Sequence, residues 1–297
     1  MIDKTIYLQN SPAKHLAISQ NPFLQFFHIH LLVRRQFLAL YHAILPLFPP
    51  VGPSGNFRGI YPDLGVLESF PVTEKHVLVL ASNSPRRRQL LALADWLFYV
   101  NVADVDESQR PDEPPAGYVL RLAETKARAV TAHMNQIVLA ADTAVVDQGL
   151  ILGKPKDNAE AISMLSRLRG HTHQVYTGVA LLRLSDGLLL KELCVTDVPM
   201  RDYSDEDVNA YVQSGDPLDK AGAYAIQHPQ FHPVAMPSHG QEAMSGCYAS
   251  VMGLPMCHIV RMMRKMDIPP NADVPVNCQK LLEYQCPVSG AILSGEM

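Results

Sequence analysis

Regular alternation of apolar and polar positions begins abruptly at His76. The apolar run at residues 77 to 81, VLVLA, is typical of a buried strand. Ser84 and Pro85 follow it and suit the N-cap and the first turn of a helix, which we expect over residues 86 to 94. A globular domain is therefore predicted to begin here.

The rest of the domain alternates between helical and β-branched apolar segments. Helices are predicted at residues 116 to 134, 158 to 168, 205 to 213 and 256 to 266. Ser204 and Asp207 have capping-box spacing at the start of the third of these. Apolar runs rich in β-branched residues predict strands at residues 137 to 146, 175 to 184 and 188 to 198. This alternation indicates an α/β fold with a central sheet.

Two flanking regions fall outside this predicted domain of residues 75 to 266. Residues 1 to 74 are rich in proline and glycine after Pro46 and are expected to form a flexible or peripheral extension. Within them, Arg34 and Arg35 divide the apolar stretch 23 to 48 into pieces shorter than the roughly 20 residues of a membrane-spanning helix. We therefore expect an amphipathic or disordered segment there and no membrane partner. Residues 267 to 297 are predicted to be a C-terminal tail.

Composition narrows the class of protein. Of the 297 residues, 47% are hydrophobic and 18% are charged, as in a soluble protein with one or two cores. A net charge of −4 provides no global positive field for a nucleic acid partner. The five cysteines are odd in number and lack C-x-x-C spacing, which argues against a zinc ribbon or a dense disulfide framework. We expect a reducing, cytoplasmic location.

A basic segment lies between the first predicted strand and helix. Arg86, Arg87 and Arg88 follow Ser84 directly. A helix start presents free N–H groups and the positive end of the helix dipole, and neighbouring arginines strengthen its attraction for phosphate. The segment thus predicts a phosphate site, although three adjacent arginines are equally consistent with a solvated face.

Asp142 and Thr143 interrupt an otherwise apolar strand. A carboxylate buried there costs several kcal/mol unless it is paired or bound to a metal, so Asp142 is a candidate functional residue. A simple turn cap at a strand end is the alternative. Lys154 follows in a Gly-Lys-Pro loop, where its charge could reach a phosphate.

Further charged residues gather in two loops. Residues 215 to 222 combine Asp216, Asp219 and Lys220, a composition that a tight turn would also explain. Glu107 belongs to a separate acidic loop, and Lys126 is on the helix that follows it. Carboxylate ligands of this kind suit Mg²⁺ or Mn²⁺ and not zinc.

Eight short segments follow one another along the chain. They are LASNSPRRRQLL at residues 80 to 91, VDE at 105 to 107, ETKA at 124 to 127, AADTAV at 140 to 145, LGKP at 152 to 155, VYTGV at 175 to 179, SGDPLDKAGAYAIQ at 214 to 227 and GLP at 253 to 255. In this order they resemble the Maf, or septum-formation-inhibitor, family of nucleotide pyrophosphatases. The resemblance covers nearly all of residues 77 to 266.

The resemblance implies a mixed, twisted sheet with flanking helices and two lobes around a cleft, similar to the inosine triphosphate pyrophosphatases, and a homodimer. It implies that Asp142 is the catalytic base. The substrate contacts that it implies are Ser82, Arg87, Lys126, Lys154 and Lys220, and the divalent-metal carboxylates are Glu107, Asp142 and Asp219. Base selection in the family is associated with the positions of Arg86, Thr143 and Gln227, which look like those of the dTTP/UTP subgroup.

The chain departs from the family pattern around Gln227. Ala225 replaces a usual glycine, and His228 and Pro229 stand where a glycine usually follows. The loop from residue 227 to 248 also looks longer than usual. These changes bear on base selection and nearby lid geometry more than on the chemistry.

The implied reaction converts a pyrimidine nucleoside triphosphate to the monophosphate and pyrophosphate. Water attacks the α-phosphorus, and preorganised cations stabilise the charge that spreads over the phosphate oxygens. Asp142 either deprotonates the water or helps to hold the metal ion, and we favour the general base with partial metal contact. The alternative is a nucleotide-binding regulator of cell division without catalysis.

Overall fold

The computed structural model describes residues 77–235 and 244–297. The predicted extension 1 to 74, with its apolar stretch 23 to 48, lies outside the described residues. Within the described ranges, no helix combines the length and the apolarity needed to cross a membrane.

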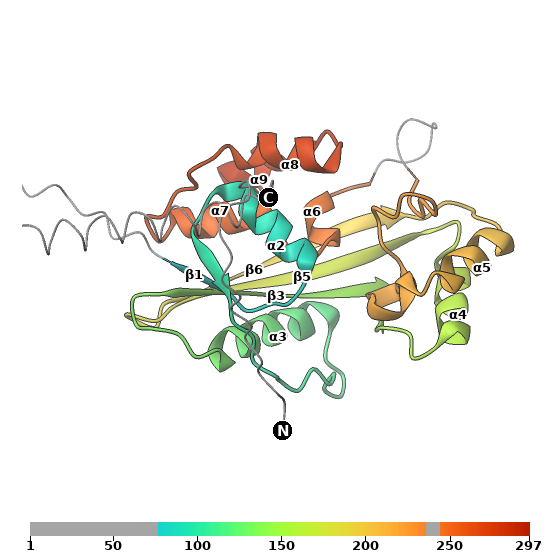
Figure 1. Ribbon diagram of the computed structural model, residues 1–297, viewed down its shortest axis with the longest axis horizontal. Helices are drawn as coiled ribbons and strands as arrows, with labels where there is room; N and C mark the ends of the chain where they lie inside the picture. The colour runs from blue at the N-terminus through green and yellow to red at the C-terminus, as the bar shows by residue number, and fades with distance from the viewer. Residues whose placement is uncertain (1–76, 236–243) are drawn as a thin grey trace, which may run out of the picture. The chain divides into compact units, whose positions relative to one another are not determined.

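A six-stranded mixed sheet forms the centre of the fold (Figure 1). The strands β1 (Leu78–Leu80), β2 (Phe98–Val100) and β3 (Ile137–Asp147) pair in parallel, with β1 between the other two. Antiparallel pairing joins β3 to β5 (Thr172–Arg183), β5 to β6 (Leu189–Pro199), and β3 to the short β4 (Leu150–Leu152). The predicted α/β class with a central sheet is therefore confirmed.

Helices cover both faces of this sheet (Figure 1). The helix α3 (Pro115–Ala129) packs on β3 and β5 from one face. On the other face lie α2 (Pro85–Leu91), α6 (Tyr248–Val251) and α7 (Met256–Arg264). Because both faces are covered, ten of the eleven residues of β3 are buried, and the strand reads as a continuous apolar run.

Gly178 sets the distance between α3 and the sheet. A Cβ atom at this position of β5 would lie 2.6 Å from the backbone carbon of Val119 on α3. Only glycine allows the helix backbone to approach the strand so closely. The apolar side of α3 therefore rests directly on β5 and on β3, the strand that carries Asp142 and Thr143.

The structure confirms most predicted elements. The helices α4 (Asn158–Leu168) and α5 (Asp205–Gln213) have the predicted bounds. Ser204 and Asp207 form the predicted capping box, since each side chain accepts a hydrogen bond from the other residue's backbone N–H at 3.1 Å. The prediction of a helix to residue 134 was wrong, because α3 ends at Ala129. Val130 is extended and buried beside Ala123 and Ala127 of α3, and Thr131 is β-branched and thus also a weak helix former.

The segment after residue 266 is folded onto the domain. It contains α8 (Val274–Leu282) and α9 (Ser289–Ser294), for which the sequence predicted no elements. Val274, Tyr284 and Ile292 are buried in the main hydrophobic core. Polar contacts add to this packing: Trp96 Nε1 donates to the Pro269 carbonyl at 3.0 Å.

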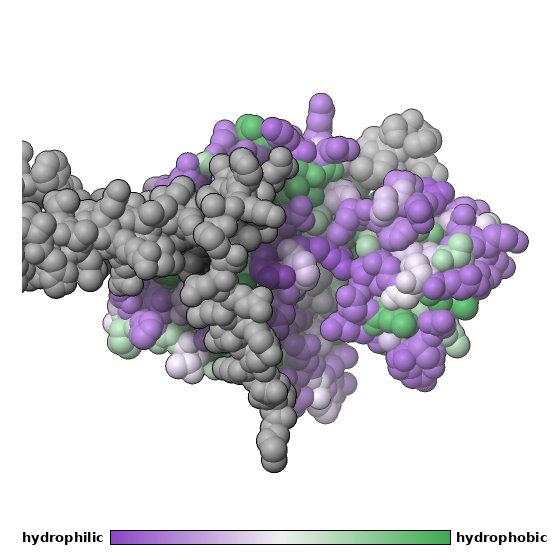
Figure 2. Space-filling view, in the orientation of Figure 1, coloured by the Kyte–Doolittle hydropathy of each residue, from purple (hydrophilic) through white to green (hydrophobic). Residues whose placement is uncertain are grey.

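The surface seen in Figure 2 is largely hydrophilic, and apolar residues appear in small separate patches. This distribution is ordinary for a folded domain. A cavity within the described ranges is bordered by the short 3₁₀ segments η3 (Asp216–Asp219) and η4 (Ala221–Ala223).

Candidate active site

A cavity of about 830 Å³ opens beyond the carboxyl end of β1. Its walls come from the start of α2, the middle of β3 and the η3 and η4 segments. This volume lies in the range of small-molecule sites. Every site residue predicted from the sequence lines it: Ser82, Arg86, Arg87, Glu107, Lys126, Asp142, Thr143, Lys154, Asp219, Lys220 and Gln227.

The start of α2 fixes Arg87 at the cavity wall. Ser84 is the N-cap and accepts a hydrogen bond from the Arg87 N–H, and Pro85 occupies the first turn, as predicted. The Arg87 guanidinium donates from Nε to the Gly253 carbonyl at 2.8 Å and from Nη1 to Ser82 Oγ at 3.4 Å. Gly253 has a φ of +100°, and a Cβ there would lie 3.0 Å from Arg87 Nε. Glycine is therefore required where the arginine crosses the loop.

Two carboxylates face the Arg87 guanidinium. Burial lowers the pKa of Arg87 below its ordinary value, while the negative charges of Asp142 and Glu107 act in the opposite direction. An arginine stays protonated throughout the ordinary pH range, so the cavity keeps a fixed positive charge.

The hydroxyl of Thr143 also holds Arg87. Arg87 Nη2 donates to Thr143 Oγ1 at 3.2 Å, and Thr143 Oγ1 lies 3.0 Å from Thr177 Oγ1. Thr177 donates its single hydroxyl proton to the Ser250 carbonyl at 2.8 Å. Because a carbonyl only accepts, the proton between the two threonines belongs to Thr143. Thr143 therefore donates to Thr177 and turns its lone pairs towards Arg87.

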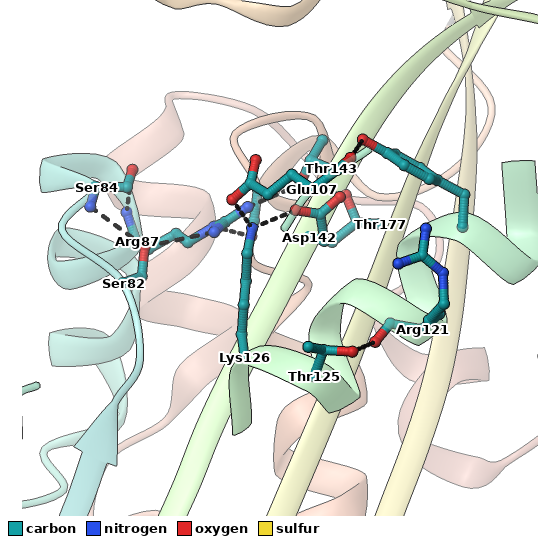
Figure 3. Close-up of polar contacts among 12 residues, drawn as sticks. Ser82, Ser84, Arg87, Glu107, Arg121, Thr125, Lys126, Asp142, Thr143 and Thr177 are labelled. Carbon is teal, nitrogen blue, oxygen red and sulfur yellow. Dashed lines mark hydrogen bonds and ion pairs between the residues drawn. The ribbon is translucent and has the colours of Figure 1, made fainter. Parts of the chain in front are cut away.

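Lys126 brings the two acidic residues together (Figure 3). From α3, its Nζ atom lies 2.6 Å from Asp142 Oδ1 and 2.7 Å from Glu107 Oε1. Asp142 is 6% exposed and lies within β3, as the apolar run around it predicted. The ion pair with Lys126 therefore compensates the free-energy cost of burying this carboxylate. The other oxygen, Asp142 Oδ2, has no hydrogen-bond partner among the described residues.

The remaining cations differ in how they are held. Lys220 is 9% exposed, and its Nζ donates to the Asp216 carbonyl, to Asp216 Oδ1 at 2.9 Å and to Asp219 Oδ1 at 2.6 Å. These three acceptors fix the Lys220 ammonium at the cavity wall. Lys154 is exposed and makes no ion pair or side-chain hydrogen bond within the described part of the chain. Lys154 is thus available to meet an anion directly.

The carboxylates fit a divalent cation only in part. Glu107 and Asp142 converge on one ammonium atom, so their oxygens already surround a positive charge. Mg²⁺ commonly uses one or two carboxylates and takes its other ligands from phosphates and water. Asp219 is paired with Lys220, and the described residues contain no group of three or more potential metal ligands. Glu107 and Asp142 are therefore the two carboxylates that would hold such a cation.

The departures around Gln227 lie at the cavity. Gln227, His228 and Pro229 all line it. His228 Nδ1 accepts the Phe231 N–H at 3.0 Å, so this ring closes the turn of residues 228 to 231. Since Nδ1 accepts, the proton of the neutral ring is on Nε2. Sequence reasoning missed Gly253 and Thr177 as parts of the site, although the GLP and VYTGV segments that contain them were recognised.

Comparison with known proteins identifies a family match and several similar proteins. Residues 77–266 match the family model described as Maf-like protein. A Geobacter sulfurreducens protein named dTTP/UTP pyrophosphatase is 45% identical over 195 residues, which is 65% of this chain and 98% of that protein. A Dehalococcoides mccartyi protein of the same name is 39% identical over 194 residues, or 65% of this chain and 84% of that protein. Among solved structures, the Staphylococcus aureus Ham1 protein is 16% identical with a TM-score of 0.36, covering 74% of this chain and 100% of that chain. The family match spans every predicted site residue.

Proposed function

The chain belongs to the Maf-like protein family, and we propose on this premise that it hydrolyses dTTP and UTP to the nucleoside monophosphate and pyrophosphate. Its relatives named dTTP/UTP pyrophosphatase support the activity and the substrate class. The observation that carries the proposal is the buried Asp142 carboxylate, paired with Lys126 in a cavity lined by cationic side chains.

Asp142 is proposed to act as the general base. Oδ1 is held by Lys126, while Oδ2 is free of partners among the described residues and can accept a proton from water. The water then attacks the α-phosphorus, and pyrophosphate leaves. A carboxylate that is held by one oxygen and open at the other is oriented for this proton transfer.

The cations are proposed to stabilise the phosphate charge. Arg87 and Lys220 are fixed by their hydrogen bonds, so they need little rearrangement as charge develops on the phosphate oxygens. Lys154 adds a charge that has no competing partner in the described ranges. A divalent cation bound by Glu107 and Asp142 supplies further charge neutralisation when present.

Arg86, Thr143 and Gln227 are proposed to bear on base selection. The test is pyrophosphate release across a panel of NTPs and dNTPs, with Mg²⁺ and with Mn²⁺. We expect dTTP and UTP to be turned over at least about tenfold faster than ATP or GTP, a difference of roughly 1.4 kcal/mol in the barrier. A purine preference would refute the substrate assignment, and nucleotide binding without turnover would favour the regulator.

The same premise favours a cytoplasmic homodimer. All five cysteines are free thiols, which suits a reducing compartment. Light scattering during size-exclusion chromatography tests the dimer, because a monomer mass of 32.8 kDa at micromolar concentration would contradict it.

A further inference from the structure

Tyr211 on α5 connects two segments of the cavity wall without lining the cavity itself. One is the Lys220 loop, residues 216 to 220, and the other is the Gln227 segment, residues 225 to 228. The Tyr211 hydroxyl donates to Asp216 Oδ2 at 2.7 Å and accepts the Ala225 N–H at 3.0 Å. One buried atom is therefore bonded to both segments.

The direction of both hydrogen bonds is fixed by chemistry. An ionised carboxylate only accepts and a backbone N–H only donates, so the Tyr211 proton must point to Asp216. Tyr211 is 3% exposed, and burial raises the pKa of its phenol above the ordinary value, which keeps the proton in place. The hydroxyl thus uses its donor on one segment and an acceptor on the other.

The contact with Asp216 continues to the Lys220 ammonium. Asp216 Oδ1 accepts from Lys220 Nζ at 2.9 Å, while Oδ2 accepts from Tyr211. Burial alone would raise the pKa of Asp216, but hydrogen bonds from Tyr211 and Lys220 outweigh it and lower the pKa. The carboxylate therefore stays charged and orients the lysine.

The aromatic ring of Tyr211 supports the other segment. It stacks on Phe231 with centroids 4.4 Å apart and lies 4.6 Å from the His228 ring. His228 in turn accepts the Phe231 N–H, as described above. In the Gln227 segment, the Tyr211 hydroxyl therefore holds Ala225 at one end and the Tyr211 ring contacts His228 at the other.

We propose that Tyr211 is a positioning residue that fixes Lys220 and Gln227 relative to each other, so that one nucleotide meets the phosphate contact and the base contact together. The inference rests on the proposed function for the roles of Lys220 and Gln227. In this role Tyr211 aligns Lys220 and Gln227 and does not itself contact the nucleotide.

Tyr203 offers a matched control for the test. It is 2% exposed, its hydroxyl donates to the Leu165 carbonyl at 2.7 Å, and its ring lies 4.9 Å from the same Phe231. Tyr203→Phe therefore removes a buried hydroxyl from the same aromatic cluster without touching either segment. Tyr211→Phe removes the hydroxyl while the ring contacts remain.

The experiment compares kcat and KM of both variants for dTTP and ATP, together with their melting temperatures. We expect Tyr211→Phe to lower the dTTP-to-ATP ratio of kcat/KM about tenfold, as the loss of a hydrogen bond to a charged group allows. Tyr203→Phe should lower the melting temperature to a similar extent and leave the ratio unchanged. Equal ratios in the two variants would overturn the proposal.

A second readout separates this inference from the proposed reaction. Hydrogen–deuterium exchange of peptides covering residues 216 to 228 requires no turnover. Tyr211→Phe should speed exchange there at least about fivefold relative to Tyr203→Phe, because the Ala225 N–H loses its acceptor. An unchanged exchange rate in Tyr211→Phe would overturn the proposal that the Tyr211 hydroxyl holds the two segments, even if the enzyme is active. Faster exchange in a protein that hydrolyses no nucleotide would leave the connection intact and reject the reaction.

Discussion

Asp142 combines a buried position with one occupied and one open oxygen. This asymmetry suits the proposed general base, because Oδ2 keeps its lone pairs for a proton from water. Lys126 holds the occupied oxygen and shares its charge with Glu107. Single substitutions at this cluster therefore separate proton transfer from nucleotide binding.

The first substitution is Asp142→Asn, which keeps the size of the side chain and removes its charge. We expect kcat to fall at least about a hundredfold, as is typical when a general base is lost. Nucleotide affinity should survive through Arg87, Lys154 and Lys220. Turnover and the affinity for a non-hydrolysable triphosphate are measured on the same preparation.

Lys154→Ala is the contrasting variant. Its ammonium meets phosphate in both the ground and the transition state, so KM should rise along with any loss of kcat. Near wild-type turnover by Asp142→Asn would show that Asp142 is not the general base.

Thr177 lies behind the cavity and acts on Arg87 through Thr143. Thr177→Val removes the hydroxyl that accepts from Thr143, so the Thr143 proton is free to turn towards the guanidinium. The Ser250 carbonyl keeps the Gly253 N–H at 2.8 Å, which limits the loss of stability to about 1 kcal/mol. We expect KM to rise about fivefold for all triphosphates alike, because a phosphate contact is loosened.

Steady-state kinetics with dTTP and ATP checks this expectation, and Thr177→Ser should restore the wild-type KM. A KM change confined to one base would instead connect Thr177 to base selection.

Among the elements, α4 and α5 were predicted from their periodic patterns and β1 from its apolar run, whereas the short β2, β4 and α6 and the C-terminal α8 and α9 were not predicted. The α4 and α5 bounds follow from apolar spacing and from the caps Asp157 and Ser204. The strands β2 and β4 have three residues each, and α6 has four, which is too short to show a period. The site residues were found through motifs, whereas the Thr177 hydroxyl is buried behind the wall and only the fold brings it to Arg87.

The contact between β6 and α7 depends on Glu192. Its carboxylate lies 3.0 Å from His258 Nδ1 and 2.8 Å from Arg261 Nη2. Burial would raise the pKa of Glu192, but the hydrogen bonds from His258 and Arg261 outweigh it and lower the pKa from 4.5 to about 2. A carboxyl with a lowered pKa stabilises the fold above its ordinary pKa and loses this contribution as the pH falls towards the lowered value.

We therefore expect Glu192→Gln to lower the free energy of unfolding by about 2 kcal/mol near pH 7. The difference from wild type should shrink between pH 4.5 and about pH 2. Urea unfolding across this range measures it, with the exposed Glu296→Gln as control. A difference that is constant with pH would show that the charge of Glu192 is not the cause.

At the scale of the whole molecule, the core extends beyond the family match. The match ends at residue 266, yet Val274, Tyr284 and Ile292 belong to the same continuous hydrophobic core as the sheet. Arg261 Nη1 donates to the Ile292 carbonyl at 2.8 Å and Asn277 Nδ2 donates to the Leu93 carbonyl at 3.1 Å. The described C-terminal segment is thus part of the folded domain and not an appended tail.

A chain ending at Met266 should consequently be less stable by at least about 3 kcal/mol, because three large apolar side chains lose their burial and the α7 face is uncovered. Thermal unfolding of this shortened chain measures the effect. Ile292→Ala should reproduce part of it, about 2 kcal/mol, with the rest of the segment in place. An unchanged melting temperature in both variants would show that residues 267 to 297 do not stabilise the domain.

The hydrogen bonds within the cavity wall also determine where conformational entropy is lost. Arg87, Lys126 and Lys220 are immobilised by partners from their own chain, so their rotamer freedom disappears when the protein folds. Lys154, without such partners in the described ranges, keeps its freedom until a nucleotide arrives. Ordering one long cationic side chain costs about 2 kcal/mol. Association with the triphosphate therefore bears the ordering cost of Lys154, whereas folding has already borne that of Arg87, Lys126 and Lys220.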